Sequence, residues 1–217
     1  MSASRSCTSE SLVDSADVPY IYAFDHKHRR PPRELRDLLG GKGANLAEMT
    51  SVLELPVPPG FTISTDACRD YMAGGWPKDL SEEIAKHVFQ LETTMGRKLG
   101  DPYDPLLVSV RSGAKYSMPG MMDTVLNLGL NDTSVEGLAH VTHDLRFAYD
   151  SYRRFISMFG RIVLGVEAEV FDHPLEEAKA AAKVAADSDL SAAALMELCE
   201  TYKQLVEKET GSPFPQK

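Results

Sequence analysis

The sequence predicts an α+β fold in which a region of mixed strands and helices, residues 20–130, is followed by an all-helical region, residues 131–210. Two patterns indicate this division. Short runs of β-branched and aromatic residues alternate with amphipathic stretches in the first region, whereas only the 3.6-residue periodicity of helices continues in the second. The 217 residues are 43% hydrophobic and 25% charged, which is the balance of a globular chain that buries its own core.

Strands in the first region are predicted where apolar and β-branched residues gather between turn-forming residues. These segments are residues 20–24, 61–64, 106–110 and 124–128. The third is an apolar run between a proline and an arginine, a pattern that is typical of a strand buried on both faces.

Helices in the first region are predicted from apolar spacing and from residues that start or stop helices. They are expected over residues 44–53, 65–74 and 81–96. The first emerges from a glycine loop. The second begins behind Ser64 or Thr65, either of which caps a helix, and the third ends near Gly96.

The second region contains three predicted helices. A capping box of Thr133 and Glu136 starts the first of them, whose apolar spacing continues to Phe159 and ends at Gly160. Two more helices are expected over residues 174–185 and 190–209.

Composition and the chain ends exclude several classes of protein. The net charge is −9 and no Lys/Arg run exceeds two residues, which disfavours nucleic acid and anionic membranes as partners. No apolar stretch is long enough to span a bilayer. The polar residues 1–19 are expected to be a disordered tail without a secretory signal, and residues 211–217 to begin a linker into further sequence.

The cysteines and histidines suggest no metal site. The three cysteines are far apart and form no CxxC pair, so we expect neither a disulfide framework nor a zinc site, and we expect the reducing cytoplasm as the location. His140 and His143 lie three residues apart, but no cysteine or carboxylate cluster accompanies them.

The first candidate site is the segment GGKGANL, residues 40–46. Glycines at a helix start let backbone N–H groups converge on an anion, and Lys42 adds a mobile positive charge, so this segment is a candidate phosphate site. Its spacing matches neither the P-loop nor the GxGxxG pattern. The alternative interpretation is that Gly40 and Gly41 end a helix and form a turn.

The second candidate site covers residues 108–124. Arg111 lies at the end of a predicted buried strand, where its guanidinium requires an anionic partner or solvent and is suited to bind phosphate in a bidentate manner. Ser112 and several glycines follow, so the loop can approach a ligand closely, and its three methionines suit either a core or a wall facing adenine. The alternative is a plain β-connection fixed by a salt bridge between Arg111 and Asp123.

Three stretches of the chain resemble the N-terminal part of the pyruvate, phosphate dikinase family. They are LLGGKGANLAEM (residues 38–49), PVPPGFTISTDAC (residues 56–68) and LLVSVRSGAKYSMPGMMDTVLNLGLND (residues 106–132). They occur in the family's order with similar spacing and cover about half of the chain. The resemblance implies an ATP-grasp-type lobe over residues 20–130 and a helical subdomain over residues 131–210, which agrees with the change of pattern described above.

The resemblance also implies a reaction in which ATP, phosphate and pyruvate become AMP, pyrophosphate and phosphoenolpyruvate through a phosphohistidine. Lys42 matches the family's glycine-loop lysine, which lies against the ATP phosphates. Arg111 matches the arginine that stabilises the transferring phosphoryl group, so these two are the expected catalytic residues. The expected ATP-binding residues are Lys42, Arg111, Ser112, Gly120, Met121, Met122, Asp123 and Thr124.

The family likeness implies Mg²⁺ and a homodimer for the full-length enzyme. It places the metal ligands, the phosphohistidine and the pyruvate site beyond residue 217, so the chain is expected to be an incomplete piece that is inactive alone. Two alternatives stay open. One is the N-terminal part of a phosphoenolpyruvate synthase, which uses water in place of phosphate, and the other is a non-catalytic nucleotide-binding or interaction protein.

Overall fold

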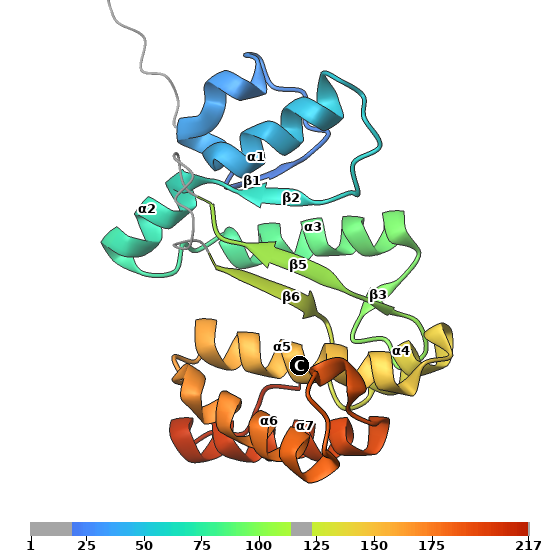
Figure 1. Ribbon diagram of the computed structural model, residues 1–217. Coiled ribbons are helices and arrows are strands. Elements are labelled where there is room, and N and C mark those ends of the chain that lie inside the picture. The colour runs from blue at the N-terminus through green and yellow to red at the C-terminus, as the bar shows by residue number, and fades with distance from the viewer. Residues whose placement is uncertain (1–18, 114–122, 217) are drawn as a thin grey trace, which may run out of the picture.

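The computed structural model describes residues 19–113 and 123–216 (Figure 1). The first range contains β1 (Ile21–Ala23), the 3-10 helix η1 (Pro32–Leu35), α1 (Arg36–Ser51), β2 (Phe61–Ile63), α2 (Thr65–Gly74), α3 (Leu80–Met95), β3 (Lys98–Leu99), β4 (Pro105–Leu106) and β5 (Val108–Arg111). The second contains β6 (Thr124–Leu128), α4 (Ser134–Thr142), α5 (Leu145–Ile162), α6 (Ala168–Ala182), η2 (Asp187–Asp189) and α7 (Ala192–Thr210). This mixture of helices and small sheets is compatible with the expected α+β class. The expected tail lies outside the described residues, apart from Pro19.

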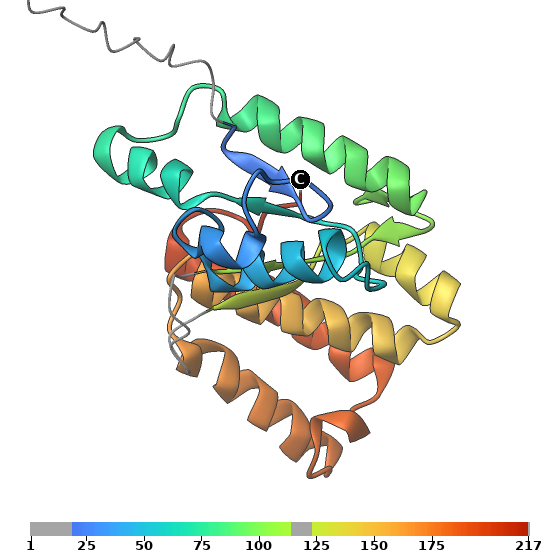
Figure 2. The ribbon, with the colours of Figure 1, turned by 90° about the horizontal axis from the view of Figure 1, so that it is seen from above.

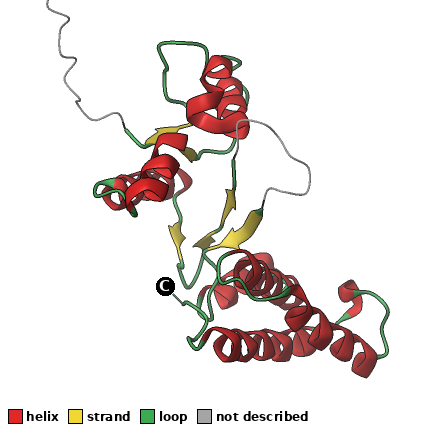
Figure 3. Ribbon diagram, turned by 90° about the vertical axis from the view of Figure 1, so that its left-hand side faces the viewer, coloured by secondary structure: helices red, strands yellow, loops and turns green. Residues whose placement is uncertain are grey.

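The described strands form three sheets of two strands each. β1 and β2 are antiparallel, β3 and β4 are parallel, and β5 and β6 are antiparallel with Arg111 opposite Thr124. Figure 2, seen from above, shows α1 and α3 on opposite sides of the β1–β2 pair, in agreement with the contacts of α1 with β2 and of α3 with β1. The β5–β6 pair lies between this upper part and the helices α5–α7 (Figures 1 and 3), and α5 contacts β6.

The largest hydrophobic cluster lies in the helical part of the chain. Tyr152 and Ile156 of α5 and Leu195 and Val206 of α7 are at most 1% exposed, and Val125 of β6 belongs to the same cluster. Two smaller clusters support the upper part. Full burial of one large apolar side chain contributes about 1.5–3 kcal/mol. Because the largest cluster has many more buried side chains than the other two, most of the apolar stabilisation lies in the helical part, against which the small sheets pack.

Several predicted elements are confirmed. Strands were expected at the positions of β1, β2 and β6, and the helix over residues 65–74 is α2. The Ser64 side chain caps α2 by accepting a hydrogen bond from the backbone N of Ala67 (3.3 Å). Helix α3 ends at Gly96, whose φ of +66° is the left-handed conformation that glycine adopts most easily.

The prediction of a strand buried on both faces over residues 106–110 is wrong. β5 begins at Val108, and Val110 is 51% exposed. A strand is buried on both faces only when layers cover both sides of its sheet. β5 belongs to a two-stranded sheet, whose other strand contacts α5 on one side.

The predicted capping box is also wrong, because Asn131 caps α4. Its side-chain oxygen accepts hydrogen bonds from the backbone N of Thr133 (2.9 Å) and of Ser134 (2.7 Å), whereas Thr133 makes no side-chain cap. An Asx turn of this kind satisfies backbone N–H donors at the start of a helix, as a capping box does with a different pair of donors. The Ser134 hydroxyl in turn donates to the carbonyl of Gly129 (2.8 Å), which ties the start of α4 to the end of β6.

The helix expected to run from Thr133 to Phe159 is two helices. His143 has a φ of +52° and ends α4, and Asp144 starts α5 by accepting a hydrogen bond from the backbone N of Phe147 (2.8 Å). Gly160 does not end the run, since α5 continues to Ile162. Gly160 instead gives room to the ring of Phe171, because a Cβ at Gly160 would lie 2.5 Å from that ring.

The last two helices are shifted from their predicted bounds. α6 begins six residues before Pro174, because Phe171 must lie on the helix to pack against Tyr202, with ring centroids 5.0 Å apart. It ends at Ala182, where Lys183 adopts a φ of +56°. α7 begins after Ser191, which caps it. No described helix combines the length and the apolar character needed to cross a bilayer.

The two described cysteines differ in environment and should differ in reactivity. Cys199 is 1% exposed and burial raises the pKa of its thiol to about 12, whereas Cys68 is exposed. Alkylation requires an accessible thiolate. Iodoacetamide at pH 8 is therefore expected to modify Cys68 in the native protein and Cys199 only after unfolding, as measured by peptide mass spectrometry. Equal rates at the two thiols in the native state would contradict the burial of Cys199.

Candidate functional site

Lys42 is placed by a break in α1 at Gly40. Gly40 has φ +67° and ψ 169°, a backbone conformation that lies outside the helix and that glycine adopts without strain. The alternative interpretation, in which glycine ends a helix, therefore applies only to the short helical turn that precedes Gly40. The helix resumes behind it, so Lys42 lies in the first turn of the resumed helix, which is the placement expected of a glycine loop followed by a helix.

The Lys42 ammonium group reaches the second candidate segment. Its Nζ donates a hydrogen bond to the backbone carbonyl of Ser112 (3.1 Å), across 70 residues of sequence. Ser112 directly follows Arg111, the last residue of β5. The two motifs that were singled out separately in the sequence therefore meet at one end of the β5–β6 pair.

Ser112 also closes the base of the loop that joins β5 and β6. Its backbone N and its hydroxyl both donate to the carbonyl oxygen of Asp123, each at 3.0 Å. Asp123 is followed by Thr124, which pairs with Arg111 across the sheet. Lys42, Arg111, Ser112, Asp123 and Thr124 are thus brought together. The expected site residues Gly120, Met121 and Met122 lie outside the described residues.

The guanidinium of Arg111 is available to an external anion. Arg111 is exposed, and the ion pairs of residues 19–113 and 123–216 do not include one between Arg111 and Asp123. The salt-bridge alternative is therefore wrong. An exposed strand end places the guanidinium in water, so this side chain needs no internal carboxylate to offset burial.

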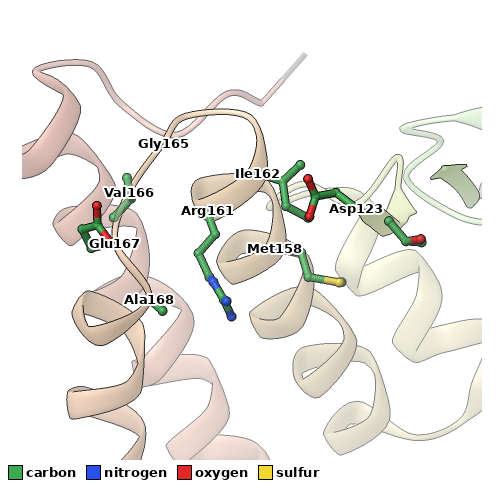
Figure 4. Close-up of a pocket in the computed structure, with 9 residues that line it drawn as sticks. Asp123, Met158, Arg161, Ile162, Gly165, Val166, Glu167 and Ala168 are labelled. Carbon is green, nitrogen blue, oxygen red and sulfur yellow. The ribbon is translucent and has the colours of Figure 1, made fainter. Parts of the chain in front are cut away.

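A cavity of about 550 Å³ opens on the helical side of the same strand end (Figure 4). It is lined by Asp123 and Thr124 and by residues from the end of α5, the following turn and the start of α6. Figure 4 shows the side chain of Arg161 extending between α5 and α6, while Asp123 approaches from the strand side. The residues that line this cavity do not include Lys42, Arg111 or Ser112, so it adjoins the candidate site only through Asp123 and Thr124.

Sequence reasoning missed the part of this cavity that comes from α5. Met158, Arg161 and Ile162 of α5 all line the cavity, and their i, i+3, i+4 spacing places them on one face of the helix. The helical spacing of these residues can be read from the sequence. The element beside them cannot, because only the contact of α5 with β6 brings this face of the helix to Thr124.

The described residues contain no cluster of side chains that could hold a metal ion by themselves. Nowhere in the described ranges do three His, Cys, Asp or Glu side chains gather in a group that can hold a metal ion. Mg²⁺ is bound through carboxylates, substrate phosphates and water. The site built here thus consists of two cationic side chains, Lys42 and Arg111, with backbone and hydroxyl groups beside them.

An ammonium group and a guanidinium at one strand end, beside a glycine break in a helix, are typical of proteins that bind the phosphates of nucleotides. A family model described as "Pyruvate phosphate dikinase, AMP/ATP-binding domain" matches residues 36–76 and 73–158, together more than half of the chain. The chain belongs to the pyruvate, phosphate dikinase family.

Relatives named pyruvate, phosphate dikinase share about half of their residues with this chain. The Rhizobium meliloti protein is 51% identical over 199 residues, the Giardia intestinalis protein 53% over 200, and pyruvate, phosphate dikinase 1 of rice, Oryza sativa, 54% over 197. The matches cover 90–91% of this chain but only 21–22% of these relatives. The chain therefore spans about a fifth of the length of the curated relatives it matches.

Proposed function

We propose that this chain is the N-terminal nucleotide-binding portion of a pyruvate, phosphate dikinase. The complete enzyme would convert ATP, phosphate and pyruvate into AMP, pyrophosphate and phosphoenolpyruvate through a phosphohistidine. The observation that carries the proposal is the hydrogen bond from Lys42 to the carbonyl of Ser112, which puts an ammonium group beside the strand end that bears Arg111. Family membership supports the same assignment.

The proposed roles of these two residues are electrostatic. Phosphoryl transfer spreads negative charge over the phosphate oxygens, and cations already in place stabilise that charge without reorganisation. Lys42 would lie against the ATP phosphates, and Arg111 would bind the transferring group in a bidentate manner. Asp123, Thr124 and the Ser112 hydroxyl would border the nucleotide.

The finer architecture is part of the proposal. We assign residues 20–130 to an ATP-grasp-type lobe, residues 131–210 to a helical subdomain, and residues 211–217 to the start of a linker, of which Phe214 packs into the helical cluster. The Mg²⁺ ligands, the phosphohistidine and the homodimer contacts would come from other parts of the full-length polypeptide. The free state of Cys68 and Cys199 supports a reducing, cytoplasmic location.

The test is the phosphate dependence of the full-length polypeptide that carries this sequence. With ATP, pyruvate and Mg²⁺, we expect phosphoenolpyruvate and pyrophosphate to appear only when inorganic phosphate is present, as followed by ³¹P NMR. Formation of phosphoenolpyruvate without added phosphate and without pyrophosphate would instead identify a water-using phosphoenolpyruvate synthase. Absence of any reaction together with absence of ATP binding would reject both enzymes.

The isolated chain provides a second test. Half of the proposed nucleotide clamp and the metal ligands would be missing from it, so the contacts that hold ATP would be incomplete. Titration calorimetry of the 217 residues with MgATP is expected to show weak binding and no turnover. A micromolar dissociation constant would mean that these residues form a complete nucleotide site by themselves.

A further inference from the structure

Helix α1 touches strand β2 through Gly43, the residue that follows Lys42. A Cβ built on Gly43 would lie 2.7 Å from both Cγ2 and Oγ1 of Thr62 and 3.3 Å from its Cβ. Real Cβ atoms essentially never approach other atoms to 2.7 Å. The bare backbone of Gly43 is therefore what lets the helix lie against Thr62, and no larger residue fits without moving one of the two elements.

Thr62 is held firmly on the strand side of this contact. It pairs with Tyr22 of β1, and Tyr22 is 7% exposed in the small cluster that includes Ala44 and Ala47 of α1. The strand therefore cannot move away from Gly43 without disturbing the packing of the same helix against Tyr22.

A further hydrogen bond joins the start of α1 to α2, the helix that follows β2 in the chain. The hydroxyl of Thr65, at the start of α2, donates to the backbone carbonyl of Asp37 in α1. Helix α1 is thus held at Gly43 by a close approach and near its start by this hydrogen bond. Because α2 follows β2 closely in the chain, this hydrogen bond also restrains the start of α1 relative to the end of β2.

The position of α1 decides where the Lys42 ammonium group lies. Lys42 is covalently next to Gly43, and its Nζ is 3.1 Å from the carbonyl of Ser112, in the longer part of the ordinary range for an N–H···O hydrogen bond. A shift of α1 away from Thr62 would carry the backbone of Lys42 with it. The ammonium group would then meet the β5 strand end, and any phosphate held there, in a different geometry.

We propose that Gly43 and Thr62 are positioning residues that set the reach of Lys42 toward the end of β5. The assignment rests on the proposed function and deepens it, because it names what places the lysine that would bind the ATP phosphates. Neither residue touches substrate in this proposal. Gly43 acts by lacking a side chain, and Thr62 acts as the fixed surface against which α1 packs.

The test compares the two half-reactions of the full-length enzyme. In the Gly43→Ala variant, the new methyl group pushes α1 off Thr62, and a displacement of a catalytic group by about 1 Å can cost about 100-fold in rate. We expect the ATP half-reaction, measured as AMP release per enzyme, to fall by about 10- to 100-fold. Isotope exchange between pyruvate and phosphoenolpyruvate should be unchanged per folded enzyme.

Removing the obstructing atoms should reverse the effect. In Gly43→Ala/Thr62→Ala, the Cγ2 and Oγ1 atoms are gone and only the Cβ contact at 3.3 Å is left, a distance at which small shifts suffice. We expect the double variant to recover most of the ATP half-reaction. Failure of this rescue in a folded double variant would overturn the assignment of Thr62.

Gly137→Ala is the matched control. A Cβ at Gly137 in α4 would lie 2.5 Å from the backbone oxygen of Pro102, a closer approach than at Gly43, and its three nearest atoms belong to Pro102 and Tyr103. This variant is expected to lose stability but to keep the ratio of the two half-reactions. If Gly43→Ala changes both half-reactions together, as Gly137→Ala would, the contact is merely structural and the inference is wrong.

Two outcomes separate this inference from the proposed function. If Lys42→Ala leaves the ATP half-reaction intact, the proposed function fails. If Lys42→Ala abolishes it and Gly43→Ala does not impair it, only the positioning role fails. Should Gly43→Ala not fold, Thr62→Ala alone decides: a severalfold lower ATP half-reaction rate with unchanged pyruvate exchange supports the role, and unchanged rates in both overturn it.

Discussion

Substitution of Lys42 or Arg111 by alanine in the full-length enzyme is expected to slow the ATP half-reaction by about 100- to 1,000-fold for each residue. Lys42 Nζ lies 3.1 Å from the carbonyl of Ser112, the residue after Arg111, so both cationic residues are found at the same end of β5. Removing either one leaves phosphate charge unmatched at the moment it spreads during transfer. AMP and pyrophosphate release in a single turnover measures the effect.

The second half-reaction is the internal control for this prediction. Exchange between phosphoenolpyruvate and pyruvate does not involve ATP, so it should proceed at the unaltered rate in both variants. Arg111→Lys should recover only part of the activity lost in Arg111→Ala, because an ammonium group lacks the planar, two-pronged geometry of a guanidinium. Equal losses in the two half-reactions would place the defect in folding and would count against the assigned roles.

The second large effect concerns stability, and its origin is the buried guanidinium of Arg153. Arg153 in α5 is 5% exposed and donates to Oδ1 of Asp150 at 2.7 and 3.2 Å, and Asp187 of η2 lies 3.4 Å away. Truncating Arg153 removes the buried cation from Asp150 and leaves that carboxylate with only the exposed guanidinium of Arg154. Arg153→Ala is therefore expected to lower the free energy of unfolding by about 3–5 kcal/mol.

Arg154 provides a closely matched comparison for Arg153. It is the next residue in sequence and pairs with the other oxygen of Asp150 at 3.0 Å, but its side chain is 58% exposed. Water screens such a pair, so Arg154→Ala should cost about 0–1 kcal/mol. Urea unfolding followed by far-UV circular dichroism measures both. Similar losses in the two variants would mean that burial does not decide the strength of these ion pairs.

Local features of the sequence predicted the structure correctly where an element is formed by interactions within its own segment. The helix over residues 65–74 was predicted correctly because Ser64 caps it through a hydrogen bond only three residues long. The strand at residues 124–128 was also predicted correctly from its composition and the turn that follows it. Such interactions are made within a few residues, so the pattern contains all the information they require.

The predictions failed where distant residues decide the outcome. Burial on both faces was expected for residues 106–110, but Val110 is 51% exposed because a strand's surroundings are not encoded in the strand. The start of α6 was placed at Pro174, although the packing of Phe171 against Tyr202 extends the helix before the proline. In both cases tertiary packing overrode a local preference.

The same division applies to the candidate site. The sequence alone determined the family, the glycine segment around Lys42, and the strand that ends at Arg111, since residue types and short spacings define all three. Only the tertiary structure decided that Lys42 reaches Ser112, that Gly43 lies against Thr62, and that Arg161 and Asp123 line one cavity. The physical reason is that contacts across 70 residues depend on how closely α1 packs on β2, and a linear pattern does not contain that distance.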